Sequence, residues 1–560
     1  MPPRSQAVQD EINRLARSRA DERGAVFTRS DVVEFMLDLA GYTADQDLRH
    51  FRLLEPSCGD GEFLLAAATR LLTSYFDRGG TPAESELHLK SCLLGVELHV
   101  DTYDHLTFRV KALLAAYLVP QEIQEALAAA WLRQDDFLLT PISGSFTHVV
   151  GNPPYVRQEA VSPLLLTAYK ARYATIYDRA DLFVPFFERG LDLLADGGRL
   201  CFICSDRWLR NKYGGPLRNK VAQHFHVKAF VDMVDTEAFQ DSVTAYPAIT
   251  LITRDTGHET RLTLRPTLNA THLQALTRGL LGEAEHPDVE TVEHAVKAAE
   301  PWLLDLGPGL AVLREIEDRF PSIEEAGCTI GIGVATGADA VYIRQRDTVP
   351  IEESRKVPLV MASDVRSGTV RWSGHVVVNP FEDDGRLVHL DRYPMLNAYF
   401  NKHEVTVRGR RVGQRAVSWY RTIDKINTAL TSTPKLLIPD MSGKPAVAYD
   451  PGEYYPHHNL YVITADEWDL LALKTVMRSR VTELFIRGYS VKMRGGTLRY
   501  QAQYLRRLRL PKWRDVSEAK RLQLRALADS ADEHAVNDAV FTLYGLSQHS
   551  IDVLNAALEA

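Results

Sequence analysis

Cysteine is scarce in this sequence, with five residues among 560, and long hydrophobic runs are lacking. So few cysteines argue against an oxidising compartment. The lack of any run of about 18 apolar residues argues against a membrane span. Residues 1–24 carry charges throughout and contain no apolar stretch of the kind found in secretory signals. We therefore expect a cytoplasmic protein that does not enter a membrane.

Acidic residues are scarce in two segments of the C-terminal half, although the whole chain has a formal net charge of −8. Residues 474–514 contain twelve Lys and Arg and one acid, Glu483. Residues 401–427 contain seven Lys and Arg against two acids. A basic half on an acidic chain predicts a polyanionic partner. A solvated face with salt bridges is the alternative interpretation for any one Arg.

The length of 560 residues predicts several domains, and 45% apolar with 25% charged residues is a globular composition. Apolar runs alternate with helical patterns up to residue 255, which predicts a Rossmann-like α/β fold with a mainly parallel, doubly wound sheet. After residue 310 short strands and many Gly and Pro predict a mixed α+β domain. We expect a first domain at 1–255, a helical connecting segment at 256–310, a second domain at 311–515 and a helical tail at 516–560.

A glycine-rich turn follows the first apolar run of this pattern, in LEPSCGDGEF, residues 54–63. Gly59 and Gly61 permit a sharp turn and a close backbone approach, and the helix that follows offers free N–H groups to an anion. No Gly-Lys-Ser/Thr follows, and the spacing is not GxGxxG, so neither nucleotide-binding pattern applies. Taken alone, this stretch also fits an ordinary strand-to-helix turn.

Acidic residues end the next two predicted strands. Glu97 closes GVEL, where a carboxylate can accept both hydroxyls of a ribose. Asp136 precedes Phe137 in RQDDFLL, and an acid that accepts an exocyclic amine beside a stacking ring describes an adenine pocket. Each acid alone also fits a surface loop. Because the glycine turn and the two acids fall on three successive strand–helix units, they predict an adenosine-bearing cofactor, and the lack of a phosphate-binding Lys favours S-adenosylmethionine (SAM) over ATP or NAD.

The fourth apolar run ends in a rigid corner, Asn152-Pro153-Pro154-Tyr155. Its two prolines fix two φ angles and remove two backbone donors. The side-chain oxygen of Asn152 and the carbonyl of Pro153 are acceptors at fixed spacing for the two N–H groups of an adenine amine, and Tyr155 can stack on the base. The corner therefore predicts direct methyl transfer to that amine, with a rigid turn without chemistry as the alternative. Such a transfer needs no thiol, so Cys58 is not assigned as a nucleophile.

In their order, these motifs resemble the γ-class N6-adenine DNA methyltransferases, the TaqI-like group of type II restriction–modification enzymes. RGAVFTRSDVVEFML (23–37), LEPSCGDGEF, GVEL, DDFLL and GNPPY match the family's motifs, and DLFVPFFERGLDLLADGGRLCFICSDRWL matches the segment that follows. One departure is Arg29, where the family often has Pro after its Thr. The resemblance implies SAM contacts at Thr28, Glu55, Pro56, Ser57, Cys58, Glu97, Asp136 and Pro154, to which the expected set adds Gly59, Gly61 and Phe137.

The stretch DTEAFQDSVTAYPAITLI resembles the family segment whose Phe stacks on the other face of the flipped base. By this resemblance the residue is Phe239, and the catalytic set becomes Asn152, Pro153, Tyr155 and Phe239. From the residues alone, Phe239 would instead be interpreted as a core side chain.

The second domain has the features of a DNA target-recognition domain. An adenine inside a duplex must be flipped out to be methylated, which requires contacts with the duplex from elsewhere in the protein. CTIGIGVATGADAVYIR (328–344) and YYPHHNLYVI (454–463) resemble pieces of such domains in the γ class. The candidate DNA-binding residues are Arg408, Arg410, Arg411, Arg415, Arg421, Lys492, Arg494, Arg499, Arg506 and Arg507.

No metal site is predicted. Cys201 and Cys204 have zinc-knuckle spacing but lie in an apolar strand without a partner pair. The adjacent His457 and His458 are expected to contact DNA or solvent. A fused nuclease is not expected either, because no Pro-Asp is followed closely by Glu-x-Lys.

The sequence therefore predicts a SAM-dependent, site-specific methyltransferase that acts on N6 of a flipped adenine in duplex DNA. We expect a monomer that acts beside a separate cognate restriction endonuclease. Two alternatives stay open: the same chemistry on RNA or on protein glutamine, and a DNA-binding subunit with an inactive methyltransferase fold.

Overall fold

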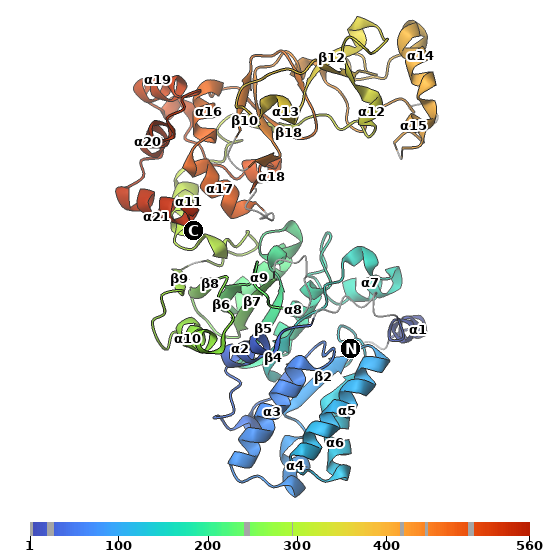
Figure 1. Ribbon diagram of the computed structural model, residues 1–560, viewed down its shortest axis with the longest axis vertical. Coiled ribbons are helices and arrows are strands. Elements are labelled where there is room, and N and C mark those ends of the chain that lie inside the picture. The colour runs from blue at the N-terminus through green and yellow to red at the C-terminus, as the bar shows by residue number, and fades with distance from the viewer. Residues whose placement is uncertain are drawn as a thin grey trace. The chain divides into compact units, whose positions relative to one another are not determined.

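The chain folds into two compact units, Met1–Gly307 and Pro308–Ala560, whose helices and strands are drawn in Figure 1. The structure is a computed structural model that describes residues 4–18, 27–239, 247–293, 295–410, 412–414, 419–442, 446–490 and 498–559. The second unit begins close to residue 311, where the sequence predicts the start of the second domain.

A nine-stranded sheet forms the centre of the first unit, in the order β3-β2-β1-β4-β5-β7-β6-β8-β9 (Figure 1). β7 runs antiparallel to β5 and β6, and β9 runs antiparallel to β8, whereas the other neighbours are parallel. The predicted mainly parallel sheet is confirmed. Its strands are β1 (Leu53–Glu55), β2 (Leu93–Glu97), β3 (Leu132–Gln134), β4 (Phe146–Gly151), β5 (Leu194–Ser205), β6 (His226–Asp232), β7 (Pro247–Thr253), β8 (Glu259–Leu264) and β9 (Glu290–Glu293).

Helices cover both faces of this sheet. Cys201 and Ile203 of β5 belong to the core cluster that includes α2. Phe202 points to the other face, where its ring centroid lies 5.1 Å from that of Phe187 in α8. A strand buried on both faces explains the unbroken apolar run of β5. The helices of this unit are α1 (Gln6–Leu15), α2 (Ser30–Ala40), α3 (Glu62–Asp77), α4 (Ser85–Leu89), α5 (Val100–Ala116), α6 (Gln121–Trp131), α7 (Pro163–Lys170), α8 (Phe183–Asp192), α9 (Gly215–His224) and α10 (Ala270–Leu281).

The glycine-rich turn is fixed by the helix that follows it. The buried side chains of α3 recur at helical spacing, as in Phe63, Ala67 and Leu71, and form one stripe against the sheet. This stripe begins two residues after Gly61, which is the N-cap of α3. The turn is therefore held at the edge of the sheet where β1 ends.

The segment 256–310 differs from the helical connection that the sequence predicts. It contains α10 but also β8 and β9, which extend the sheet beyond β6. In ETRLTL the polar and apolar residues alternate, so β8 is buried on one face only and its signal is weaker than that of the central strands. The central sheet therefore continues beyond residue 255, as far as β9.

The second unit has the mixed α+β character that the sequence predicts. Its two four-stranded sheets have the orders β10-β18-β14-β16 and β11-β13-β12-β17, and a two-stranded sheet joins β15 to β19. The strands are β10 (Cys328–Ile332), β11 (Ile343–Gln345), β12 (Lys356–Val360), β13 (His375–Val378), β14 (Lys435–Pro439), β15 (Met441–Ser442), β16 (Ala448–Asp450), β17 (Tyr455–Pro456), β18 (Leu460–Ala465) and β19 (Leu498–Arg499).

The C-terminal segment is helical, as predicted, and it packs within the second unit. Thr475 of α16 donates a 2.6 Å hydrogen bond to the carbonyl of Leu524 in α19, and α21 contacts α11 and α17. Within the described residues, no helix has the length and apolar character needed to cross a membrane. The helices of this unit are α11 (Gly309–Arg319), α12 (Asp339–Tyr342), α13 (Ala362–Val365), α14 (Pro394–Lys402), α15 (Glu404–Arg408), α16 (Leu470–Met477), α17 (Arg480–Tyr489), α18 (Ala502–Leu505), α19 (Glu518–Ala526), α20 (Glu533–Tyr544) and α21 (Gln548–Glu559).

Candidate active site

The candidate residues of the first unit meet at one edge of the sheet. β1, β2 and β4 are parallel neighbours and end at Glu55, Glu97 and Gly151. Because the carboxyl ends of parallel strands lie on the same side, the loops that follow them share this edge. The structure thus brings together the glycine-rich turn, the acid at the end of β2 and the Asn152 corner.

The glycine-rich turn places backbone donors toward the second strand. Gly59 and Gly61 adopt φ values of +51° and +91° in the left-handed region. The Cys58 N–H donates to the carbonyl of Val96, and the Gly59 N–H donates to Oε2 of Glu97 at 2.9 Å. Cys58 is buried, which raises the pKa of its thiol well above the usual value. The thiol stays protonated at neutral pH, so Cys58 serves this turn as a backbone and packing element.

Glu97 is an oriented acceptor. It is buried, and its carboxylate accepts the N–H of Gly59 on one oxygen and the N–H of His99, at 2.8 Å, on the other. A carboxylate can accept about four hydrogen bonds, and these two bonds, one on each oxygen, fix its position. This arrangement suits a diol such as a ribose.

Asp136 is buried after β3 and is held by a residue that the sequence did not single out. Tyr169 of α7 donates its hydroxyl proton to Oδ2 of Asp136 at 2.5 Å. Burial raises the pKa of the Asp136 carboxyl, and the bond from Tyr169 acts in the opposite direction. Nothing in the sequence around Tyr169 signals this contact, since it joins positions 33 residues apart.

Phe137 does not lie open at the rim as predicted. It is 3% exposed, and its ring packs 5.0 Å from that of Phe186 and under the guanidinium of Arg189. Arg189 also donates to the backbone carbonyls of Phe137 and Thr140. The apolar ring belongs to the core beneath the loop, and its stacking on an adenine stays a prediction.

Glu55 presents a buried carboxylate at the end of β1. Its side chain is 1% exposed, and among the described residues Oε2 has no hydrogen-bond partner. Burial raises the pKa of this carboxyl well above its usual value. A buried carboxyl oxygen without a hydrogen-bond partner suits a cationic group, such as an α-ammonium. Pro56 is buried beside it. A Cβ on Gly151 would lie 3.5 Å from side-chain carbons of both Glu55 and Pro56, so the backbone of Gly151 passes close to them.

The Asn152 corner is tied to two other loops of the site. Nδ2 of Asn152 donates to Oγ1 of Thr28 at 3.2 Å, and Oγ of Ser57 donates to the Asn152 carbonyl at 3.1 Å. Pro153 is buried and Pro154 is half-buried. The amide nitrogen of Asn152 lies toward Thr28, and this bond tethers the side chain to the segment around Thr28.

Two aromatic rings lie beside this corner. Tyr155 and Phe239 meet edge to face, with centroids 6.3 Å apart and planes at 84°. Burial raises the pKa of the Tyr155 hydroxyl well above its usual value, so it stays neutral. The structure therefore pairs the two residues that the sequence assigns to the faces of one base, although positions 155 and 239 lie in different loops.

A short segment around Thr28 connects these parts. Thr28 forms a β-bridge with Phe239, and the Arg29 N–H donates to the carbonyl of Ala238 at 3.1 Å. The Arg29 guanidinium pairs with Asp31 and Glu237. Arg29 thus supplies, through ion pairs, a constraint at the position where the family often has Pro. A cleft of about 450 Å³ runs from Thr28 to Gly61 between the starts of α2 and α3.

The candidate DNA-binding residues differ in the contacts that they make within the protein. Arg411, Arg415, Lys492 and Arg494 lie outside the described residues. Arg410 donates to the carbonyls of Val407, Thr336, Trp419 and Arg421, which makes it a structural residue of its own domain. The guanidiniums of Arg408, Arg499 and Arg506 pair with Glu404, Asp440 and Glu324, whereas Arg421 contacts its neighbour Thr422 and Arg507 lies over the ring of Tyr489.

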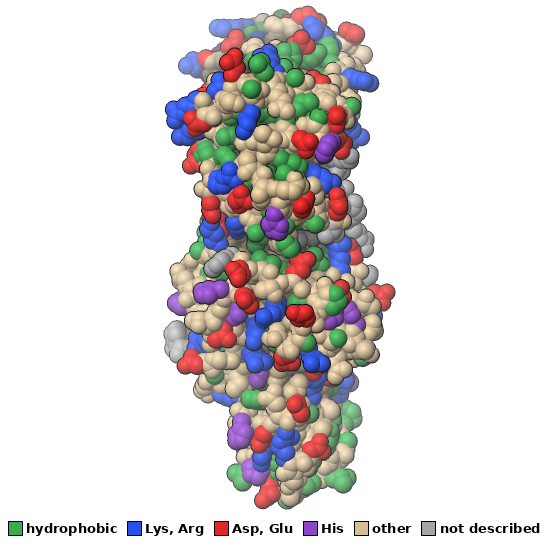
Figure 2. Space-filling model, turned by 90° about the vertical axis from the view of Figure 1, so that its left-hand side faces the viewer, with side chains coloured by type: hydrophobic (Ala, Val, Ile, Leu, Met, Phe, Trp, Pro, Cys, Tyr) green, Lys and Arg blue, Asp and Glu red, His purple; other side chains and the backbone are tan. Residues whose placement is uncertain are grey.

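Basic side chains are spread over the surface of the second unit. On the face drawn in Figure 2, Lys and Arg are interspersed with Asp and Glu. A cleft of about 600 Å³ in this unit is lined in part by Arg319, Lys512, Arg514 and Lys520. The sequence analysis missed this group, because its members come from α11, α19 and the segment between α18 and α19.

Two groups of His and Asp lie close enough to hold a metal ion. The ligand atoms within each group lie within 4.8 Å of one another, and the groups are His272, His286 and Asp288, and Asp339, His457 and His458. His457 is 3% exposed and lies 3.3 Å from Asp339, so the expectation that it faces DNA or solvent is corrected. Cys201 and Cys204 are both buried in β5.

Similar sequences point to one class of enzyme. The family model of the Eco57I restriction-modification methylase matches residues 96–239, which span the site from Glu97 to Phe239. The type II methyltransferase M.PaeR7I of Pseudomonas aeruginosa is 49% identical over 540 residues, 95% of this chain and 94% of that protein. The type II methyltransferase M.XhoI of Xanthomonas vasicola is 46% identical over 95% of this chain and 99% of that protein.

A solved structure shares the fold over nearly the whole chain. The type IIL restriction-modification enzyme MmeI, solved in complex with DNA, superposes with a TM-score of 0.59 at 12% identity. The match covers 99% of this chain and 78% of that one. At this identity the likeness is one of fold.

Proposed function

Because the chain belongs to the type II methyltransferases of restriction–modification systems, and is thus a DNA methyltransferase, we propose that it methylates N6 of adenine with SAM as donor. The observation that supports this choice most directly is the corner at Asn152. Its amide, the Pro153 carbonyl, and the Tyr155 and Phe239 rings gather where the strand tips meet. An exocyclic amine on a flat ring is the group that two acceptors and two aromatic faces fit.

The residues at the strand tips fit SAM. Oε2 of Glu55, which has no hydrogen-bond partner among the described residues, suits an ammonium group, the oriented carboxylate of Glu97 suits a ribose, and Asp136 suits an adenine amine. Thr28, Ser57, Gly59, Gly61 and Pro154 complete the expected contacts. When bound, SAM supplies a methyl group on a sulfonium, which is electrophilic enough to react with a weak nucleophile.

The amine of adenine is a weak nucleophile because its lone pair is delocalised into the ring. Asn152 and the Pro153 carbonyl accept its two N–H groups and so favour a pyramidal nitrogen. The hydrogen bond to Thr28 tethers the Asn152 side chain to the segment around Thr28. Groups preorganised in this way contribute on the order of 10²–10³ in rate.

Duplex DNA is the proposed substrate, and the second unit is proposed to recognise its sequence. Flipping an adenine costs a few kcal/mol, which contacts elsewhere on the duplex must offset. Of the described candidates, Arg421 contacts its neighbour Thr422 and Arg507 lies over the ring of Tyr489, and a guanidinium at either position suits a phosphate contact. We further propose that the protein acts as a monomer beside a separate endonuclease for the same site.

The first prediction concerns Asn152. Asn152→Ala is expected to bind SAM within about twofold of the unsubstituted chain and to lose methyl transfer by roughly 10²–10³-fold, because it removes an acceptor for the target amine only. Transfer of a labelled methyl group from SAM to duplex DNA, RNA and peptide would be measured, with Asn219→Ala on α9 as the matched control.

We expect labelling of duplex DNA at N6 of adenine, and mapping of that base would report the recognition sequence. Full activity of Asn152→Ala would refute the mechanism. Labelling of RNA or peptide in place of DNA would refute the substrate, and DNA binding without any turnover would favour an inactive methyltransferase fold.

A further inference from the structure

The loop that carries Asp136 is held from several sides. We call residues 135–140 the adenine loop. Tyr173 donates its hydroxyl to the Leu138 carbonyl at 2.5 Å, and Arg172 donates to the Leu139 carbonyl at 2.9 Å. Both lie just after the C-terminal end of α7. Helix α7 begins eight residues after Tyr155 of the Asn152 corner, and the residues just after its C-terminal end contact the adenine loop.

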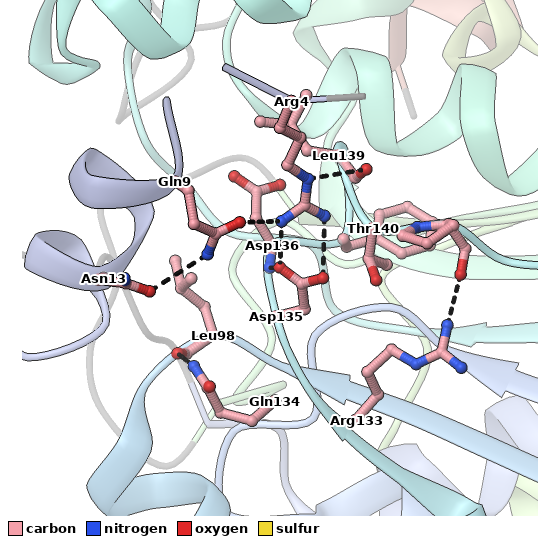
Figure 3. Close-up of polar contacts among 12 residues, drawn as sticks. Arg4, Gln9, Asn13, Leu98, Arg133, Gln134, Asp135, Asp136, Leu139 and Thr140 are labelled. Atoms are coloured by element: carbon pink, nitrogen blue, oxygen red, sulfur yellow. Dashed lines mark hydrogen bonds and ion pairs between the residues drawn. The ribbon is translucent and has the colours of Figure 1, made fainter. Parts of the chain in front are cut away.

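The N-terminal segment reaches the same loop. Figure 3 shows Arg4 pointing its guanidinium at the carboxylate of Asp135, with Gln9 of α1 beside it. The two N–H···O distances to Asp135 are 2.7 and 2.8 Å, and Nε of Arg4 lies 3.3 Å from the Leu139 carbonyl. This bidentate pair fixes the side chain next to Asp136 and leaves Asp136 itself to another partner.

That partner is Tyr169. Its hydroxyl lies 2.5 Å from Oδ2 of Asp136, and the backbone N–H of Leu138 is a further donor to the same carboxylate. Tyr169 is 3% exposed and Asp136 is 4% exposed, so the contact is shielded from water. The contacts that Arg4, Arg172 and Tyr173 make with the loop go to backbone carbonyls or to Asp135.

A bond to one oxygen fixes the rotation of the whole carboxylate. Asp136 turns about its side-chain torsions unless one oxygen is anchored, and a carboxylate retains acceptor capacity after accepting one hydrogen bond. Tyr169 is the side chain that, together with the Leu138 N–H, sets the direction in which the remaining lone pairs of Asp136 are presented. A ligand amine that approaches the strand tips meets an acceptor of fixed orientation.

We propose that Tyr169 is a positioning residue for the cofactor: by anchoring Asp136 it selects a 6-amino purine over a 6-oxo purine. This inference rests on the proposed use of SAM. A purine with an oxygen at position 6 presents an acceptor to an acceptor, which costs binding energy because both groups are desolvated without a hydrogen bond.

The test compares two ligands on the full-length chain. S-adenosylhomocysteine carries the 6-amino group, and its inosine analogue carries oxygen in its place. Calorimetric titration of Tyr169→Phe is expected to show about tenfold weaker binding of S-adenosylhomocysteine and unchanged binding of the inosine analogue. The preference for the amino ligand thus falls about tenfold.

Tyr173→Phe is the matched control. It removes a hydroxyl near the same end of α7, but this hydroxyl donates to the backbone carbonyl of Leu138 and not to Asp136. It is expected to change the affinity for both ligands by the same factor. A second variant, Asp136→Asn, replaces an acceptor oxygen by a donor nitrogen and is expected to favour the inosine analogue. In that background Tyr169→Phe is expected to have no further effect on the preference, because it acts through Asp136.

If Tyr169→Phe lowers the affinity for both ligands equally, or for neither, the role of Tyr169 is overturned and the proposed cofactor is not. If Tyr169→Phe does not fold, a preference for the amino ligand that survives in Asp136→Asn would overturn that role. Failure of the unsubstituted chain to bind S-adenosylhomocysteine would instead overturn the proposed cofactor, and the inference with it.

Discussion

His148 is a buried histidine of β4 that stays neutral in the folded protein. It is 4% exposed, lies between the rings of Tyr42 and Phe51, and has Nε2 3.2 Å from the Ala40 carbonyl. Burial, with a contribution from Arg199, lowers its pKa from 6.5 to about 4. The unfolded chain therefore binds a proton between these two pH values and the folded chain does not.

The second prediction follows from this difference at the residue scale. Stability is full above pH 6.5 and falls as the pH decreases toward about 4, by about 2 kcal/mol at pH 5 for this residue. The His148→Gln variant keeps a hydrogen-bond donor for the Ala40 carbonyl, but its side chain does not bind a proton in this pH range. Urea unfolding at pH 7.5 and pH 5 is expected to show a smaller loss in the variant. The same loss in both proteins would contradict the lowered pKa.

Single residues were predictable where a motif fixes them by backbone geometry. Asn152 follows a strand directly and is rigidified by Pro153, so its place at the strand tips follows from the sequence. Tyr169 could not be found in this way, because its contact depends on how α7 packs over a distant loop. The surroundings of Arg410 were equally hidden, because a charge does not reveal whether carbonyls of its own domain will surround it.

At the scale of elements, the turn into α3 depends on one glycine more than on the other. A Cβ on Gly61 would lie 2.3 Å from Cδ1 of Leu106, and its φ is +91°. A Cβ on Gly59 would meet only Phe27 at 3.9 Å, with a φ of +51°. Both positions disfavour a side chain, and at Gly61 the end of the Leu106 side chain would also have to move.

The third prediction compares these two positions. Gly61→Ala is expected to cost roughly 1–3 kcal/mol of stability and to abolish SAM binding, because the start of α3 must shift. Gly59→Ala is expected to cost about 1 kcal/mol, as for one residue in the left-handed region. Urea midpoints and SAM affinities of the two variants check this, and similar losses in both would contradict the close contact with Leu106.

The central strands were predictable because burial on both faces makes them continuous apolar runs. β5 and β7 are nearly or wholly buried along their apolar stretches. β8 and β9 have one solvated face or little burial, so they were hidden in a segment interpreted as a helical connection. The edge of a sheet is set by tertiary pairing, which a local pattern does not contain.

At the scale of the whole molecule, every proposed cofactor contact lies in the first unit. The second unit supplies the candidate DNA contacts, which are drawn from separate segments of the chain. A ligand that binds one unit stabilises that unit by mass action. The two compact units should therefore respond differently to SAM.

The fourth prediction is that heating the full-length chain gives two unfolding transitions, of which S-adenosylhomocysteine shifts one. At about 100 times its dissociation constant, the ligand is expected to raise that transition by roughly 5 °C. Differential scanning calorimetry measures both transitions. Glu97→Gln, with a weakened cofactor site, serves as the control and is expected to show a smaller shift. A uniform shift of both transitions would mean that the two units unfold together.

The edge-to-face contact of Tyr155 with Phe239 has a consequence for entry into the site. Their centroids are 6.3 Å apart with the planes nearly perpendicular, whereas a flat guest between parallel rings needs about 7 Å, twice the carbon–carbon contact distance. A planar ligand that enters must therefore rotate one of the two rings. It replaces the edge-to-face contact between Tyr155 and Phe239 by a stacking contact with each ring. Only a planar molecule with about the area of a nucleobase makes enough stacking contact to offset the loss of the ring–ring contact. The two rings therefore select ligands by shape before any hydrogen bond forms.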